Sequence, residues 1–125
     1  MTGFVLFITA EDLKCILGLK KYGACIRVTK AVDTLKRVDE TNIIVTTLPR
    51  KNIWLAQTPQ AFKYDLILEA HENAWRCGHV ATDDALLVER LGEKVKIIMG
   101  SRFNIKITNK EDLDVARAIL DRGLI

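Results

Sequence analysis

Proline and glycine are scarce in this 125-residue sequence, which holds 2 Pro and 7 Gly. That composition excludes collagen-like and low-complexity chains, and the sequence contains no internal repeat. Long runs of basic residues are absent as well, because no stretch of Lys or Arg exceeds two residues and the net charge is only +3. We therefore expect no nucleic-acid partner. What is present, 49% hydrophobic and 28% charged residues, indicates one ordinary globular domain.

Cysteines and long apolar runs are also few. Cys15, Cys25 and Cys77 show neither C-x-x-C nor zinc spacing, and their odd number does not suit a disulfide framework. We interpret them as reduced thiols of a cytoplasmic protein, and most simply as small buried hydrophobic residues. The apolar run at 4–8 is too short to span a bilayer and lacks the basic start of a signal peptide. We expect a buried strand there and no membrane partner.

The first half of the chain predicts a helix, a strand and a hairpin. Thr9 and Asp12 form a weak capping box, and Gly23 is expected to end that helix in a left-handed conformation. A short strand over 24–28 follows. Two β-rich pieces on either side of 39–41 then predict a hairpin within 29–48. Its faces carry Thr, Lys and Arg, which is typical of an arm that projects from a body.

The second half predicts three helices and two strands. The strands are expected over 94–100 and 104–108, where apolar and polar residues alternate. The first helix is expected to start at Thr58–Pro59 and to end at Gly78, and the second to start at Thr82 and to end at Gly92. Thr108 with Glu111 forms a capping box that starts the last helix. Alternating helices and strands favour an α/β layered domain.

Four clusters combine a hydroxyl or amide with a cation or a helix start: 33–37, Arg50 with Trp54, 57–60 and 104–106. Hydroxyls, helix starts and Lys or Arg are the groups that bind phosphate. Each cluster also has a simpler interpretation. The basic residues of 33–37 suit a solvated hairpin face, Arg50 a surface loop, Thr58 a helix cap and Lys106 a solvent-facing strand position. Residue types and spacing leave phosphate binding open.

Four segments in the same order and spacing carry a family resemblance: VDTLKRVD, WLAQTPQAF, TDDALLVE and GSRFNIKIT-x-x-EDL. Together they resemble the C-terminal half of the 2-C-methyl-D-erythritol 4-phosphate cytidylyltransferase family, over residues 9–120. The resemblance implies an α/β fold, half of a Rossmann-like nucleotidyltransferase with a doubly wound, mostly parallel sheet and a projecting β-hairpin arm. Residues 1–125 are then a partial nucleotide-diphospho-sugar-transferase-like domain, with 29–48 as its dimerisation arm.

The resemblance also implies a reaction. The family transfers CMP from CTP to methylerythritol phosphate and releases pyrophosphate, with Mg²⁺ as cofactor, in non-mevalonate isoprenoid biosynthesis. It implies a homodimer that exchanges arms, in the cytoplasm of a bacterium or in the plastid of a plant.

Family roles carry over onto four residues. Arg50 and Lys106 match catalytic positions that orient the acceptor phosphate, and Thr34 and Thr58 match further substrate-binding positions. In an arm-exchanged dimer, Thr34 and Arg50 would serve the partner's site.

The sequence departs from the family in three places. Pro49 stands where an Asp is usual, Lys30 stands where a Pro is usual, and 2–8 replaces an Asp-x-Ala-Arg-Pro element. Nothing matches the family's Gly-rich nucleotide loop, so no CTP-binding residue is expected here. We expect the acceptor-phosphate half of the site and no activity from this chain alone. Two alternatives stay open: a related ribitol-5-phosphate cytidylyltransferase, and a non-catalytic dimerising remnant.

Overall fold

The central sheet has three strands in the order β5–β2–β6. The structure is a computed structural model and describes residues 4–5 and 13–125. Its elements are β1 (Phe4–Val5), α1 (Leu13–Gly18), β2 (Ala24–Lys30), β3 (Leu35–Val38), β4 (Ile44–Leu48), β5 (Trp54–Phe62), α2 (Tyr64–Cys77), α3 (Asp84–Arg90), β6 (Lys96–Met99), β7 (Lys106–Ile107) and α4 (Lys110–Asp121). The expected Thr9–Asp12 capping box lies outside the described residues.

Strand β2 runs antiparallel to β5 and parallel to β6, so the sheet that was expected to be mostly parallel is mixed. The reason is the connection: β2 leads into the β3–β4 hairpin and β5 returns directly from it, and strands joined in this way run antiparallel. The α/β fold itself is confirmed.

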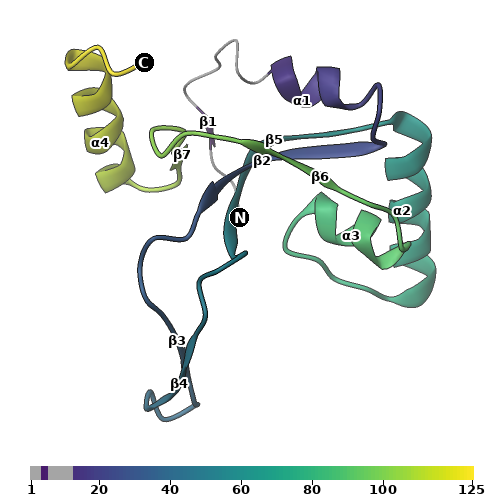
Figure 1. Ribbon diagram of the computed structural model, residues 1–125, viewed down its shortest axis with the longest axis horizontal. Coiled ribbons are helices and arrows are strands. Elements are labelled where there is room, and N and C mark those ends of the chain that lie inside the picture. The colour runs from purple at the N-terminus through teal and green to yellow at the C-terminus, as the bar shows by residue number, and fades with distance from the viewer. Residues whose placement is uncertain (1–3, 6–12) are drawn as a thin grey trace.

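Helices cover both faces of the sheet, as the alternation of side chains along β2 requires. Ala24, Ile26 and Val28 are buried in clusters that contain residues of α2 and α3. Cys25 points the other way, toward α1, where a Cβ added at Gly18 would lie 3.0 Å from its Sγ. Figure 1 shows α1 on one side of the sheet and α3 on the other. The burial of Cys25 is therefore confirmed.

Helix α4 and strand β7 form a second packing unit. Ala116 and Ile119 of α4 are buried against Ile105 and Ile107. Strand β7 pairs antiparallel with β1, with Val5 opposite Lys106.

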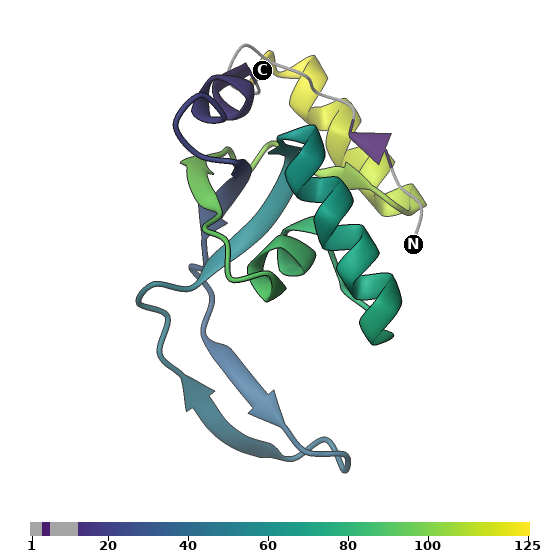
Figure 2. The same ribbon diagram turned by 90° about the vertical axis from the view of Figure 1, so that its right-hand side faces the viewer.

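The hairpin predicted within 29–48 is confirmed. Strands β3 and β4 pair antiparallel from Leu35↔Leu48 to Val38↔Ile44, and they project from the body in both views (Figures 1 and 2). Asp39 closes the turn by accepting hydrogen bonds from the N–H and hydroxyl of Thr41, at 2.8 and 2.6 Å, and from the N–H of Ile43 at 3.0 Å. Whether the hairpin dimerises the chain stays a prediction.

The helix expected to start at Pro59 is wrong, because β5 continues to Phe62. Gln60, Ala61 and Phe62 pair with Ile26, Cys25 and Ala24 of β2, and these ladder pairs override the local Thr-Pro helix start. Pro59 falls where the register shifts between the paired positions, so its missing N–H costs no ladder bond. Helix α2 begins at Tyr64 with Lys63 as a cap that makes no side-chain bond.

The N-terminal caps of α3 and α4 lie one residue after the expected positions. Asp83, not Thr82, caps α3 by accepting from the N–H of Leu86 at 2.9 Å. Asn109 and Asp112 form the capping box of α4 in place of Thr108 and Glu111. In both cases two adjacent residues could have capped, and the path of the chain into the helix chose the second.

The remaining expectations concern glycines at helix ends and the burial of cysteines. Gly78 ends α2 with a φ of 66° and Gly92 follows α3 with a φ of 80°, as expected. Helix α1 ends at Gly18, so Gly23 does not end it, and Gly23 is not among the described glycines with positive φ. Cys77 is exposed, against expectation, at the last turn of α2. The side chain of Cys15 lies outside those that the structure describes.

Candidate functional site

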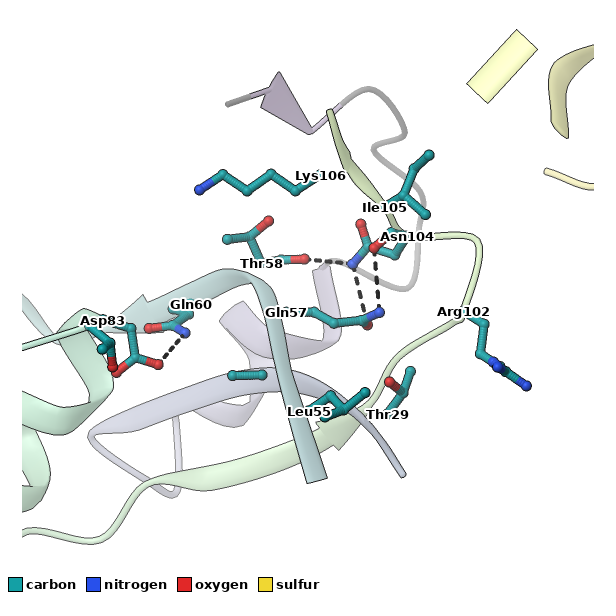
Figure 3. A pocket seen from close by; sticks show the side chains of 12 residues that line it. Thr29, Leu55, Gln57, Thr58, Gln60, Asp83, Arg102, Asn104, Ile105 and Lys106 are labelled. Atoms are coloured by element: carbon teal, nitrogen blue, oxygen red, sulfur yellow. Dashed lines mark hydrogen bonds between the residues drawn. The ribbon is translucent and has the colours of Figure 1, made fainter. Parts of the chain in front are cut away.

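A pocket of about 570 Å³ lies between β5 and the segment that enters β7. Thr29 of β2, five residues of β5, two residues before α3 and four residues of the 100–106 segment line it (Figure 3). These residues are Thr29, Leu55, Ala56, Gln57, Thr58, Gln60, Thr82, Asp83, Arg102, Asn104, Ile105 and Lys106. Of the four sequence clusters, 57–60 and 104–106 therefore meet at this pocket, whereas 33–37 and the pair Arg50 and Trp54 do not line it.

Thr58 and Lys106 are the two predicted site residues that the pocket brings together. Thr58 lies within β5, and its carbonyl oxygen accepts a hydrogen bond of 2.6 Å from Asn104 Nδ2. Lys106 begins β7, two residues after Asn104, and its side chain extends above Thr58 in Figure 3. A hydroxyl and an ammonium group at one pocket suit a phosphate ester.

Thr34 and Arg50 do not line the pocket; they lie at the base of the hairpin. Both are exposed, and Arg50 Nη1 donates a hydrogen bond to the carbonyl oxygen of Val32. Within one chain, then, the structure separates the four predicted site residues into two pairs.

The two departures near the hairpin have different surroundings. Lys30 is paired with Trp54 at the end of the β2–β5 ladder, and its Nζ lies 5.5 Å from the centre of the Trp54 ring. That distance is within the range of a cation–π contact. Pro49 is exposed and directly follows β4.

At the α3 end of the pocket, an amide and a carboxylate hold each other. Gln60 Nε2 donates to Asp83 Oδ2 at 3.0 Å, and the N–H of Ala85 donates to Gln60 Oε1 at 3.3 Å. Sequence reasoning did not connect Gln60 with Asp83, because 23 positions separate them and only the β5–α3 packing brings them together. Gln60 lies in the segment WLAQTPQAF and Asp83 in TDDALLVE, and membership of these family segments was the one indication that the sequence offered.

The described residues do not fit a resident Mg²⁺ ion. Among 4–5 and 13–125, no group of three or more His, Cys, Asp or Glu could hold a metal. Asp83 is the carboxylate at the pocket, and each of its oxygens already accepts a hydrogen bond, from Gln60 and from Leu86. Hard cations need several oxygen ligands, which this part of the chain does not offer.

None of the helices described is long and apolar enough to cross a bilayer.

Comparison with known proteins identifies a family over nearly the whole chain. The family model described as 2-C-methyl-D-erythritol 4-phosphate cytidylyltransferase matches residues 6–122. Curated proteins of that name include one from Geobacillus thermodenitrificans, 51% identical over 80% of this chain and 43% of its own length. Another, from Geotalea uraniireducens, is 54% identical over 90% of this chain and 43% of its own length.

Solved structures agree with the sequence comparison. The 4-diphosphocytidyl-2C-methyl-D-erythritol synthase from Anaerococcus prevotii superimposes with a TM-score of 0.78 at 40% identity, over 87% of this chain and 49% of that one. The 2-C-methyl-D-erythritol 4-phosphate cytidylyltransferase from Francisella tularensis has a TM-score of 0.80 at 34% identity, over 88% of this chain and 52% of that one. The chain spans about half the length of the relatives it matches.

Proposed function

The chain belongs to the 2-C-methyl-D-erythritol 4-phosphate cytidylyltransferase family, and from that premise we propose the function of its pocket. The chain supplies the acceptor-phosphate half of a site that transfers CMP from CTP to methylerythritol phosphate, a step of non-mevalonate isoprenoid biosynthesis in the cytoplasm. One observation carries the proposal: Thr58 and Lys106, 48 positions apart, line the same pocket and are linked through Asn104.

In the proposed reaction an oxygen of the acceptor phosphate attacks the α-phosphorus of CTP. A new P–O bond forms, the bond between the α- and β-phosphates breaks, and pyrophosphate leaves. Lys106 binds the attacking phosphate as a point charge, and the Thr58 hydroxyl donates to one of its oxygens. Both residues act by positioning, because phosphoryl transfer asks for alignment and charge stabilisation more than for covalent chemistry by the protein.

Thr34 and Arg50 enter the site from a second subunit in this proposal. The hairpin carries exposed apolar side chains, among them Val38, Ile44 and Val45, each more than half exposed. A two-stranded hairpin is at best marginally stable alone, so packing on a partner would stabilise it. A symmetric dimer in which each hairpin crosses over satisfies both chains with one repeated contact.

Mg²⁺ would arrive bound to the triphosphate of CTP, because the described carboxylates do not form a site for it. Its chemistry there is to neutralise the charge of the triphosphate.

The experiment that tests this function joins the chain to the nucleotide-binding half of the Geobacillus thermodenitrificans relative. With CTP, Mg²⁺ and methylerythritol phosphate, we expect the chimera to release pyrophosphate, and to do so more slowly with ribitol 5-phosphate. A chimera that is folded by circular dichroism but releases no pyrophosphate with either acceptor would contradict the proposal and favour a non-catalytic dimerising module. Preference for ribitol 5-phosphate would favour the related cytidylyltransferase.

A further inference from the structure

We propose that the side chains of Gln57 and Asn104 form a positioning unit, which we call the amide clamp, that fixes Lys106 relative to Thr58. Neither clamp residue is among those to which we assign contact with the substrate. The inference rests on the proposed function, because it assumes that Thr58 and Lys106 bind one acceptor phosphate.

The clamp is reciprocal. From β5, Gln57 Nε2 donates to the carbonyl oxygen of Ser101 at 2.8 Å and lies 3.4 Å from that of Asn104. From the opposite segment, Asn104 Nδ2 donates to the carbonyl oxygen of Thr58 at 2.6 Å and lies 3.5 Å from Gln57 Oε1. Figure 3 shows the contacts among Gln57, Thr58 and Asn104 crossing between β5 and the segment that enters β7. Both amides are only partly exposed, so water competes weakly for these hydrogen bonds.

The clamp residues are close in sequence to the two residues that are proposed to bind the phosphate. Gln57 directly precedes Thr58, and Asn104 stands two residues before Lys106. Phosphate binding by two residues depends on the distance between them, and a displacement of about 1 Å in an active site can lower the reaction rate substantially. The long, exposed side chain of Lys106 has no described hydrogen-bond partner that could set that distance, so its backbone must be held.

Gly100 supports the same inference independently. A Cβ added there would collide with Gln57 Oε1 and lie 3.1 Å from the carbonyl oxygen of Val28. The N–H of Gly100 also donates to that Val28 oxygen at 2.7 Å, which holds residue 100 close to the sheet. The absence of a side chain at 100 therefore leaves the space in which the Gln57 amide lies, and Gly100→Ala should act by displacing that amide.

The test uses the 125-residue chain and two measurements: amide hydrogen exchange, and NMR titration with methylerythritol phosphate. We expect Gln57→Ala to accelerate exchange at residues 104–107 at least fivefold, while the core amides of Ala70 and Ala74 keep their wild-type rates. We expect the same variant to weaken methylerythritol phosphate binding about tenfold. Local opening without global unfolding is the result that separates positioning from general destabilisation.

Two further variants sharpen the test. Gly100→Ala should reproduce both effects, and the double variant should be no worse than Gln57→Ala alone, because the atom displaced by the new Cβ is already gone. Gln60→Ala is the matched control: it truncates a glutamine of the same strand that lines the same pocket but bonds to Asp83. It should leave exchange at 104–107 unchanged. Gln57→Met, similar in size but without amide donors, replaces Gln57→Ala if the latter fails to fold.

The outcomes separate the clamp from the function on which it rests. Unchanged exchange at 104–107 in the Gln57 variants overturns the clamp, whatever the binding result. Faster exchange with unchanged affinity overturns its positioning role, and additive effects in the double variant overturn the part assigned to Gly100. If the wild-type chain binds no methylerythritol phosphate, the proposed acceptor site fails, and the exchange measurements alone decide whether the clamp holds Lys106.

Discussion

Lys106 and Arg102 are both exposed cations at the same pocket, but they differ in direction. The Lys106 side chain extends above Thr58, whereas that of Arg102 points away from it in Figure 3. The pair therefore offers a comparison of two exposed cations at one pocket that lie differently relative to Thr58.

Lys106→Ala should weaken methylerythritol phosphate binding by the 125-residue chain between about tenfold and about a hundredfold, the range of one hydrogen bond to a charged group. Arg102→Ala should weaken it less than threefold. The free energy of unfolding of both variants should stay within about 0.5 kcal/mol of wild type, because neither side chain is packed. Calorimetric titration and urea unfolding measure the two quantities. Equal losses for the two variants would return Lys106 to an ordinary surface lysine.

At the start of α4, the ionised carboxylate of Asp112 accepts several hydrogen bonds, so its protonation is expected to change the stability of the fold. The N–H of Thr108 donates to its carboxyl at 2.9 Å, the Thr108 hydroxyl at 2.8 Å and the N–H of Asn109 at 3.2 Å. These bonds favour the carboxylate and lower the pKa of Asp112. A folded-state pKa below the unfolded one stabilises the fold above the unfolded value and loses that effect as pH falls through the folded value.

Asp112→Asn should therefore be less stable than wild type at pH 7, and the difference should shrink as pH falls below about 4. The matched control, Asp114→Asn on the same helix, removes only an exposed ion pair of 3.7 Å with Arg117. It should differ little from wild type at neutral pH. Urea unfolding from pH 7 to pH 3 follows both. A pH-independent Asp112→Asn difference would show that the carboxylate charge plays no part.

At the scale of elements, the hairpin combines a turn ordered by hydrogen bonds with strands whose apolar side chains are exposed. Asp39 holds the turn through its hydrogen bonds, and the one from the Thr41 hydroxyl is the main cause of the lowered pKa of that carboxyl. Its strands, in contrast, leave most of their apolar side chains exposed, with only Leu35 and Leu48 partly buried. A hairpin that is locally ordered but globally uncovered is what an exchanged arm requires.

If the arms cross over, Arg50 and Lys106 of one active site come from different chains. Chimeras completed with the nucleotide-binding half and carrying either Arg50→Ala or Lys106→Ala should each be nearly inactive. After co-refolding, about half of the dimers should be mixed, with one intact site of two, so activity should recover to roughly a quarter of wild type. Pyrophosphate release measures the recovery, with mixed dimers confirmed by native mass spectrometry. Mixed dimers without recovered activity would place both residues in one chain.

On the scale of the whole molecule, large apolar side chains remain exposed over several elements. Leu55 of β5 is 52% exposed and Met99 of β6 is 60% exposed, and these strands form the two edges of the described three-stranded sheet. Open edges with apolar neighbours favour association.

The 125-residue chain should therefore sediment as a dimer or a larger species at micromolar concentration. Association through the hairpin predicts that replacing Ile43, Ile44 and Val45 with Thr shifts it toward the monomer while circular dichroism stays unchanged. Sedimentation velocity distinguishes the species. A wild-type chain that is a stable monomer under these conditions would contradict the expectation.

The same chain should also release no pyrophosphate from CTP and methylerythritol phosphate when assayed alone with Mg²⁺. Its sequence contains no match to a Gly-rich nucleotide loop, and the loss of a single donor that stabilises transition-state charge costs about 3 kcal/mol. The chimera described above is the positive control. Turnover by the chain alone at ordinary enzyme rates would mean that its own residues bind CTP.

The sequence by itself determined the α/β class, the hairpin within 29–48 and the family, because each depends on patterns that are local or that recur in a fixed order. Periodicity identifies helices and strands from neighbouring residues, and Gly78 and Gly92 end helices through their own backbone freedom. Thr58 and Lys106 were likewise found as motif positions. Local patterns also had their limit, since Thr82 was expected to cap α3 and Asp83 does so instead.

Tertiary structure alone decided the rest. The path of β5 through Pro59 depends on pairing with β2, some 30 positions earlier in the chain, and no local pattern reports that partner. The clamp between Gln57 and Asn104, and the Gln60–Asp83 contact, exist only because the sheet and α3 bring distant segments together. Hydrogen bonds between distant side chains depend on the folded path of the backbone, which sequence-local propensities do not contain.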